Sequence, residues 1–203
     1  DNSYPSKSLC LIPFRFAIEM VNRGWTIRNT VIWQKLNAMP SSVKDRFTVD
    51  FEYLFFLTKN KKYYFEQQFE NLAENTLKRT KYSNSLQNKM ASKQYSINLE
   101  SYDKYADKVQ KGILNGRNKR CVWTIPTKPF SGSHFAVYPP ELIRTCIQAG
   151  CPKNGIVLDP FAGSGTTGEE AVRQGKNYIL IELNPEYIKL IKKRLEGIQV
   201  KLL

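Results

Sequence analysis

The sequence predicts an α/β fold with a mostly parallel sheet, helices on both faces of that sheet, and a polar insertion. Three observations support this prediction. A strand, a glycine-rich loop, a helix and a second strand follow one another over residues 156–182. An amphipathic helix and two strand-like runs precede them, over residues 8–58. Between these two regions, over residues 66–119, the apolar periodicity fades and Asn, Ser, Gln, Lys and Tyr dominate.

The composition favours a polyanionic partner. The chain has 203 residues, a net charge of +13 and 31 basic against 18 acidic side chains, so it is attracted to nucleic acid in a salt-dependent way. It lacks any run of about 18 apolar residues, and we expect no membrane span. The four cysteines show no Cys-x-x-Cys spacing, and His134 is the only histidine. We therefore expect reduced thiols and no metal site.

The first half of the chain reads as a helix followed by two strands. Residues 8–23 predict a helix, with Pro13 in its first turn and Gly24 as its stop. We expect ordinary core packing for its apolar face, which comprises Leu9, Ile12, Phe16, Ala17 and Met20. The alternating run 25–33 predicts a half-buried strand, a basic loop follows, and 51–58 predicts another strand.

After the insertion, residues 121–126 predict a returning strand, and Pro139 and Pro140 open a helix that Gly150 ends. The apolar run 156–159 then predicts a buried strand that ends in an acid, Asp159.

The glycine loop and the acid beyond it predict a nucleoside site. Glycines let a ligand approach backbone N–H groups closely, because they carry no Cβ. The helix 169–174 follows, and the strand 178–182 ends in Glu182. This acid lies about 20 residues after the loop, where a βαβ unit places a carboxylate that accepts hydrogen bonds from ribose hydroxyls.

A dinucleotide site is the first rival, because Gly163, Gly165 and Gly168 satisfy Gly-x-Gly-x-x-Gly. Only about 35 residues follow the loop, however, and a dinucleotide domain needs several more strands. The run Asp-Pro-Phe-x-Gly-Ser-Gly-Thr-Thr from Asp159, with Ile-Glu-Leu-Asn-Pro-Glu-Tyr from Ile181, instead resembles the S-adenosylmethionine loop of the amino-group DNA methyltransferases. That family modifies N4 of cytosine or N6 of adenine.

The resemblance implies a Rossmann-like, S-adenosylmethionine-dependent methyltransferase fold in circularly permuted order. Residues 1–65 would form the substrate half, 66–120 a target-recognition insertion, and 121–203 the cofactor half. Glu182 would hold the ribose, and Asp159 would either orient the loop or reach the cofactor's amino group. A hydrogen-bonded loop histidine is an equal interpretation of His134. The cofactor-binding residues that the resemblance implies are Asp159, Pro160, Phe161, Ala162, Gly163, Ser164, Gly165, Thr166, Glu182, His134 and Phe135.

The loop after residue 34 and the polar insertion resemble the DNA-facing parts of these enzymes. A solvated basic loop and an unstructured insertion are the plainer alternatives. Many relatives carry a histidine before the Glu-Tyr pair of the next strand, whereas this chain reads Asp50-Phe51-Glu52-Tyr53, and no role of that histidine is carried over. The implied DNA-binding residues are Lys35, Ser41, Ser42, Lys44, Arg46, Lys78, Arg79, Lys81, Arg117 and Lys119.

The catalytic residues stay unknown. The family uses (Asp/Asn/Ser)-Pro-Pro-(Tyr/Phe/Trp), and this chain has no such tetrapeptide. The run Tyr138-Pro139-Pro140-Glu141 has the prolines without the flanking residues. Three accounts of this difference stay open: a catalytic loop upstream of Asp1, a split enzyme, and a degenerate DNA-binding protein.

The resemblance implies methyl transfer from S-adenosylmethionine to an exocyclic amino group in double-stranded DNA. It favours cytosine N4 over adenine N6, through the block Phe-Ala-Val-Tyr-Pro-Pro-Glu-Leu. We expect a restriction-modification or phage-type system, a cognate restriction endonuclease as partner, and a cytoplasmic protein of a prokaryote or phage, with a homodimer as one arrangement. An RNA base methyltransferase and a non-catalytic DNA-binding fragment are the alternatives.

Overall fold

The computed structural model of the chain describes residues 4–72, 75, 107–108, 116–128 and 137–199. The chain divides into two compact units, one formed by residues 1–66 and 121–203 and the other by residues 67–120. In the second unit, β3 (Phe69–Glu70) pairs with β4 (Arg117–Asn118) in an antiparallel manner. The predicted site residues that lie outside the described residues are Lys78, Arg79, Lys81, His134 and Phe135.

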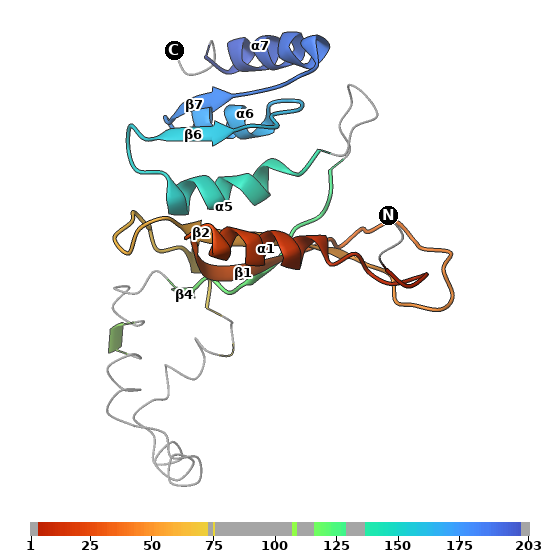
Figure 1. Ribbon diagram of the computed structural model, residues 1–203. Helices are drawn as coiled ribbons and strands as arrows, with labels where there is room; N and C mark the ends of the chain where they lie inside the picture. The colour runs from red at the N-terminus through yellow and green to blue at the C-terminus, as the bar shows by residue number, and fades with distance from the viewer. Residues whose placement is uncertain (1–3, 73–74, 76–106, 109–115, 129–136, 200–203) are drawn as a thin grey trace. The chain divides into compact units, whose positions relative to one another are not determined.

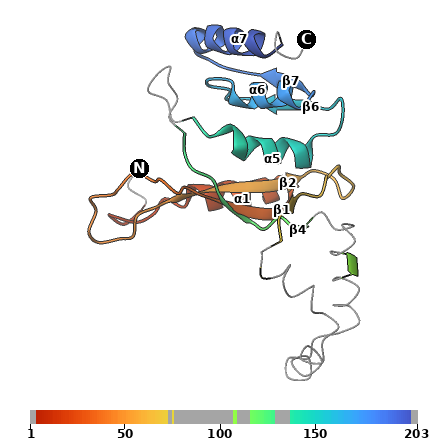
Figure 2. The ribbon, with the colours of Figure 1, turned by 180° about the vertical axis from the view of Figure 1, so that it is seen from behind.

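A three-stranded sheet in the first unit has the order β2-β1-β5. Strand β1 (Thr26–Gln34) pairs antiparallel with β2 (Phe51–Thr58) and parallel with β5 (Val122–Thr124). The predicted strands over 25–33 and 51–58 are therefore confirmed to within one residue. Figure 2 shows β1 and β2 side by side.

Helix α1 (Ile12–Asn22) begins four residues later than the sequence predicts, after Leu11 in the left-handed region at φ 55°. The expectation of ordinary core packing for its apolar face is wrong for three of the five residues. Ala17 is buried and Met20 half-buried, whereas the exposed residues of that face are Leu9, Ile12 and Phe16. Among the described elements α1 packs mainly against β1. Even Phe16, whose ring centroid lies 6.2 Å from that of Phe55, is 49% exposed.

A second, two-stranded sheet pairs β6 (Ile156–Asp159) in parallel with β7 (Asn177–Leu180). Helices α5 (Pro140–Gly150), α6 (Thr166–Arg173) and α7 (Pro185–Gln199) accompany it, and α6 contacts both other helices (Figure 1). No helix in the described ranges is long and apolar enough to cross a membrane.

The core of this region lies between the helices and one face of the β6–β7 pair. Two clusters form it, around Ala171 and around Ile191. The strand residues packed against them are Val157, Tyr178 and Leu180. The opposite face of the two strands exposes Ile156, Leu158, Ile179 and, just after β7, Ile181. The strands alternate with period 2, so the strand residues that pack against the helices fall on one face.

Local chemistry explains where two of the helices start. Pro139 precedes α5 in an extended conformation, and Pro140 occupies its first turn, where a missing N–H costs nothing. The Asn184 Oδ1 accepts a hydrogen bond from the Glu186 backbone N–H at 3.0 Å, which caps α7 ahead of Pro185.

Candidate functional site

The glycine loop joins the end of β6 to the start of α6. Gly163 and Gly165 both lie in the left-handed region, at φ 53° and 83°. The Gly165 N–H donates to the Ala162 carbonyl at 2.7 Å, and the Ala162 N–H donates to the Ile181 carbonyl at 2.9 Å. The loop is therefore a tight turn fastened to the residue after β7, at the carboxyl ends of two parallel strands.

The three glycines of the loop differ in the space around them. Among the described residues, a Cβ added to Gly163 would meet only the Phe161 carbonyl oxygen, at 4.0 Å. A Cβ on Gly165 would lie 2.9 Å from the Ile191 Cγ1. A Cβ on Gly168 would lie 2.5 Å from the Leu180 Cδ1. Gly163 thus leaves open space beside the backbone, whereas the other two glycines permit close packing.

Glu182 connects the acid beyond β7 to the glycine loop. Its Oε2 accepts the Gly163 N–H at 2.7 Å, and its Oε1 accepts the Asn184 N–H at 2.9 Å. Hydrogen bonds from the backbone N–H groups of Asn184, Gly163 and Leu183 hold the pKa of this carboxyl below its ordinary value. The carboxylate is therefore charged at neutral pH and lies directly beside the open glycine.

Asp159 is held at the other side of the loop. Its Oδ1 accepts the Phe161 N–H at 3.0 Å, and its Oδ2 accepts the Thr167 hydroxyl at 2.6 Å and the Tyr138 hydroxyl at 3.1 Å. Both carboxylate oxygens thus have partners within the protein. This arrangement supports the first of the two expected roles of Asp159, which is to orient the loop.

Tyr138 makes the stability of the protein depend on pH in the alkaline range. Burial, together with the nearby charge of Asp159, raises the pKa of Tyr138 to about 12. Because the folded protein binds this proton more tightly than the unfolded chain does, its stabilising effect is complete below pH 10 and is lost between about pH 10 and 12.

We therefore expect the free energy of unfolding to fall less steeply over this range in Tyr138→Phe than in the wild type. Urea denaturation at stepwise pH values measures the difference. Tyr187→Phe, which changes a tyrosine on α7, is the control. Parallel curves for the wild type and Tyr138→Phe would contradict the role of this hydroxyl.

The residues that the sequence predicts to bind the cofactor divide into exposed and buried ones. Pro160 and Phe161 are exposed, and Phe161 is 88% exposed. Four further members of this set are buried, namely Ala162, Ser164, Gly165 and Thr166. Pro160, Phe161 and Glu182 are therefore the predicted cofactor-binding residues that face solvent.

Two cavities flank the loop without enclosing it. One of about 410 Å³ lies between β6 and α5 and reaches Tyr138, Asp159 and Thr167. Another of about 640 Å³ lies between α5, α6 and α7. Its charges are paired with one another, as in Arg144 with Glu170 at 2.9 Å. Neither cavity includes Glu182, so we place the site from the open glycine and its carboxylate rather than from cavity volume.

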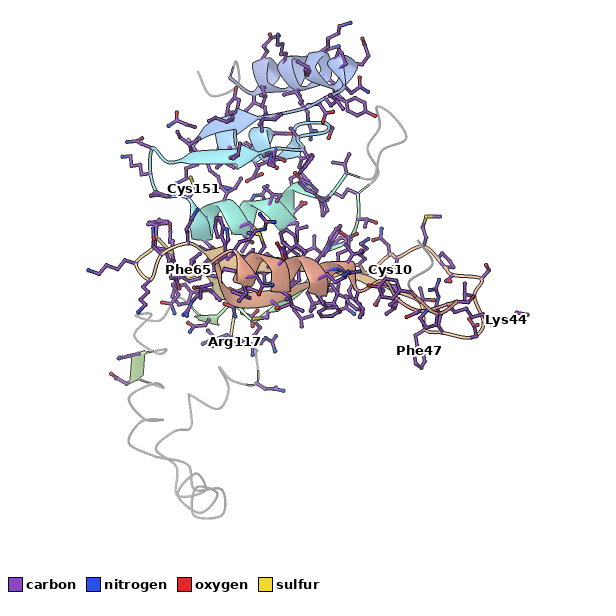
Figure 3. All side chains as sticks on the ribbon, viewed as in Figure 1. Cys10, Lys44, Phe47, Phe65, Arg117 and Cys151 are labelled. Atoms are coloured by element: carbon purple, nitrogen blue, oxygen red, sulfur yellow. The ribbon has the colours of Figure 1, made fainter. Side chains whose placement is uncertain are left out.

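The basic loop after β1 presents two cations to solvent. Lys44 and Arg46 are exposed, and neither forms an ion pair with any residue in the described part of the chain. Figure 3 shows Lys44 on the long loop that leads away from the strands. Lys35 differs, because it pairs with Glu52 and lies over the Trp33 ring.

The two serines of this loop are also exposed. The Ser41 Oγ accepts the Val43 N–H at 3.3 Å, so this hydroxyl shapes the turn, while Ser42 lies on the surface.

Two predicted DNA contacts of the second unit are described. Arg117, labelled in Figure 3, pairs with Glu70 at 2.6 Å. The Lys119 backbone N–H donates to the Gln68 carbonyl at 2.9 Å. The four cysteines form no disulfide, and no set of three metal-ligating side chains gathers among the residues that the structure describes.

Sequence reasoning missed two residues that contact the loop, Tyr138 and Arg194. Tyr138 stands directly before the proline pair, where a buried aromatic ring with a hydroxyl needs a polar partner. Arg194 lies on α7 beside Ile191 and Ile198, at the edge of its apolar face. A basic residue at that edge is the signal that could have identified it.

Comparison with known proteins gives consistent similarities. A family model described as DNA methylase matches residues 3–193. The chain is 40% identical to the type II methyltransferase M.Cfr9I of Citrobacter freundii over 191 residues, which is 94% of this chain and 51% of that protein. It is 38% identical to the type II methyltransferase M.SmaI of Serratia marcescens over 189 residues, covering 93% and 53% of the two chains. The chain thus spans about half the length of these curated relatives.

Solved structures show the same fold. The M1.HpyAVI–SAM complex matches with a TM-score of 0.59 and 24% identity, covering 93% of this chain and 71% of that one. The PvuII DNA methyltransferase, named as cytosine-N4-specific, matches with a TM-score of 0.62 and 18% identity, covering 96% and 59%. The predicted Rossmann-like α/β fold is therefore confirmed.

Proposed function

This chain belongs to the DNA methylase family, and we propose that it binds S-adenosylmethionine and serves methyl transfer to an exocyclic amino group of a base in DNA. The observation that carries the proposal is the contact between Glu182 and Gly163. It brings a charged carboxylate next to the one loop glycine beside which a Cβ would find open space. A ligand with a ribose and a flexible polar tail fits this combination of groups.

The residues present fit such a cofactor. Glu182 would accept hydrogen bonds from the ribose hydroxyls, since carboxylate oxygens accept more than one hydrogen bond each. The open side of Gly163 would admit the ligand to the loop backbone. Phe161 would pack against an apolar part of the ligand, and its present exposure would decrease on binding. The buried Ser164 and Thr166 would shape the loop from behind.

The chemistry assigns this chain the tasks of holding and aligning the reactants. When bound, S-adenosylmethionine supplies an electrophilic methyl group on its sulfonium. An exocyclic amine is a weak nucleophile, because its lone pair is delocalised into the base, so the base must be flipped out and held in line with the methyl. Acceptors must also take the amino protons. We assign no catalytic residue in this chain.

We propose cytosine N4 as the target atom in preference to adenine N6, on the resemblance of the block that ends at Leu142. A cognate restriction endonuclease, self-association as a homodimer and a cytoplasmic location stay predictions. So does the permuted order, in which a substrate half over residues 1–65 and a recognition insertion over 66–120 precede the cofactor half.

Mass spectrometry of nucleosides tests this function. The chain is incubated with S-adenosylmethionine carrying a deuterated methyl group and with duplex DNA or RNA, which are then digested. Labelled N4-methyldeoxycytidine is the expected product. Labelled N6-methyldeoxyadenosine would move the target to adenine, and label in RNA alone would favour the RNA alternative. Binding of the cofactor without label in any base would favour a split enzyme, in which another polypeptide brings the catalytic loop, or a non-catalytic DNA-binding protein.

The basic loop makes a separate prediction about DNA. Lys44 and Arg46 have no acidic partner among the described residues, so their charges are available to phosphates. We expect Lys44→Ala and Arg46→Ala each to weaken binding about equally for all duplex sequences, and each to reduce the salt slope of log K by about 1. Fluorescence anisotropy measures the affinity and the salt slope over about 50 to 300 mM salt, the range in which counterion release changes the affinity.

The matched control for this loop is Lys189→Ala. Lys189 lies on α7 and pairs with Glu186 at 2.8 Å, so its removal should leave the salt slope unchanged. A slope that falls equally in all three variants would show a general charge effect and would contradict a specific role for the loop.

A further inference from the structure

Helix α7 carries one basic residue on its inner side. Ile191 and Ile198 of this helix are buried, and the neighbouring Lys192 and Lys193 are exposed. The Arg194 side chain is only 19% exposed. Burying a guanidinium is costly unless its N–H groups form hydrogen bonds. The hydrogen-bond partners of Arg194 therefore indicate what this residue does.

Arg194 contacts the glycine loop and the start of α6 through several of its donors. Its Nη1 donates to the Ser164 carbonyl at 2.9 Å and to the Ser164 Oγ at 3.1 Å, and it lies 3.4 Å from the Thr166 Oγ1. Its Nη2 forms an ion pair with the Glu169 Oε2 at 2.5 Å. One side chain from the last helix therefore contacts three residues around the turn.

These contacts determine the orientation of one peptide group. Ser164 lies between Gly163 and Gly165, and glycine residues permit a peptide plane to rotate at little steric cost. In a trans peptide the carbonyl and the next N–H point in opposite directions. The Ser164 carbonyl points to Arg194, and the Gly165 N–H points to the Ala162 carbonyl at 2.7 Å. Rotation of this peptide would break both hydrogen bonds.

We propose that Arg194 is a positioning residue for the cofactor site, which holds the Ser164–Gly165 peptide in one orientation before the ligand binds. The inference rests on the proposed function, because it concerns the same loop. A loop that is already ordered loses less conformational entropy on binding, and its affinity is correspondingly higher. Arg194 acts through Ser164 and touches no ligand itself.

Arg173 provides a matched control. It pairs with the other oxygen of the same carboxylate, Glu169 Oε1, at 2.8 Å. It has no contact with Ser164 or Thr166 among the hydrogen bonds of the described residues. Replacing Arg173 therefore removes a cation from Glu169 without releasing the loop.

The test compares Arg194→Met, Arg194→Lys and Arg173→Met in two measurements. The first is hydrogen exchange of the ligand-free chain, followed by mass spectrometry on the peptide over residues 159–168. The second is calorimetric titration with S-adenosylhomocysteine. We expect faster exchange confined to that peptide in Arg194→Met and about tenfold weaker binding. Arg194→Lys should recover part of both effects, because one ammonium can still donate to the Ser164 carbonyl. Arg173→Met should match the wild type.

The outcomes separate this inference from the proposed function. Wild-type exchange and affinity in Arg194→Met would overturn the positioning role. Exchange that rises as much in α5 as in the loop would assign Arg194 to general packing and would overturn it as well. A wild-type chain that does not bind S-adenosylhomocysteine would refute the proposed function, and the exchange of the loop would still report whether Arg194 holds it.

Discussion

Glu182→Ala should weaken binding of S-adenosylhomocysteine by about 30-fold or more. The carboxylate accepts the Gly163 and Asn184 N–H groups at 2.7 and 2.9 Å, and it is the group that we expect the ribose to bind. Hydrogen bonds that involve a charged group contribute about 1.5–3 kcal/mol each, so the loss of one such bond to the ribose accounts for about 30-fold and the loss of two for more. Isothermal titration calorimetry measures the dissociation constants.

Two further variants serve as comparisons for Glu182→Ala. Glu182→Gln keeps one acceptor oxygen and should bind with intermediate affinity, because an amide cannot accept from every donor that the carboxylate serves. Glu186→Ala removes a neighbouring acid that pairs with Lys189 on the surface of α7, and it should bind as the wild type does. A wild-type affinity in Glu182→Ala would remove this residue from the site.

Alanine at Gly165 should cost more stability than alanine at Gly163, whereas alanine at Gly163 should cost more binding affinity. At Gly165 the new methyl group would lie 2.9 Å from the Ile191 Cγ1, in a left-handed conformation at φ 83°. We expect Gly165→Ala to lower the free energy of unfolding by about 2–4 kcal/mol, from left-handed strain and overpacking together. At Gly163 only the strain of about 1–2 kcal/mol applies, because the added Cβ meets no atom of the described part of the chain closer than 4.0 Å.

The binding of ligand should reverse this order. The methyl group of Gly163→Ala would occupy the open space beside the loop, and we expect at least a tenfold loss of affinity for S-adenosylhomocysteine, since a ligand that must approach the backbone closely is excluded. Urea denaturation and calorimetry on the same samples give both quantities. Equal losses of stability, or undiminished affinity in Gly163→Ala, would contradict the assignment of the open glycine to the ligand.

The sequence predicts the local part of this site well. The apolar run that ends in Asp159 predicts the bounds of β6 correctly. The expected burial of this strand is wrong, because Ile156 and Leu158 lie on the face that no helix covers among the described residues and are exposed. The spacing from the loop to Glu182 predicts their proximity, because neighbouring parallel strands end at the same edge of a sheet. The hydrogen bond from Gly163 to Glu182 confirms that the two are brought together.

Contacts between distant elements are harder to predict. Helix α6 begins at Thr166, three residues earlier than expected, and it accommodates Gly168 because Leu180 leaves no room for a Cβ there. The apolar period of α1 identifies a face, but it does not say whether another element covers that face. Tyr138 and Arg194 contact the loop and its flanks from 21 or more residues away in the chain, and no local pattern specifies such pairs.

The central claim is that the glycine loop and Glu182 bind an adenosyl ligand of the methyl-transfer type. Calorimetric titration of the unmodified chain with S-adenosylhomocysteine, beside a parallel titration with NAD⁺, tests it most directly. We expect saturable binding of S-adenosylhomocysteine at one site per chain and no heat of binding with NAD⁺. Saturable binding of NAD⁺ with none of S-adenosylhomocysteine would contradict the claim and return the loop to the dinucleotide class.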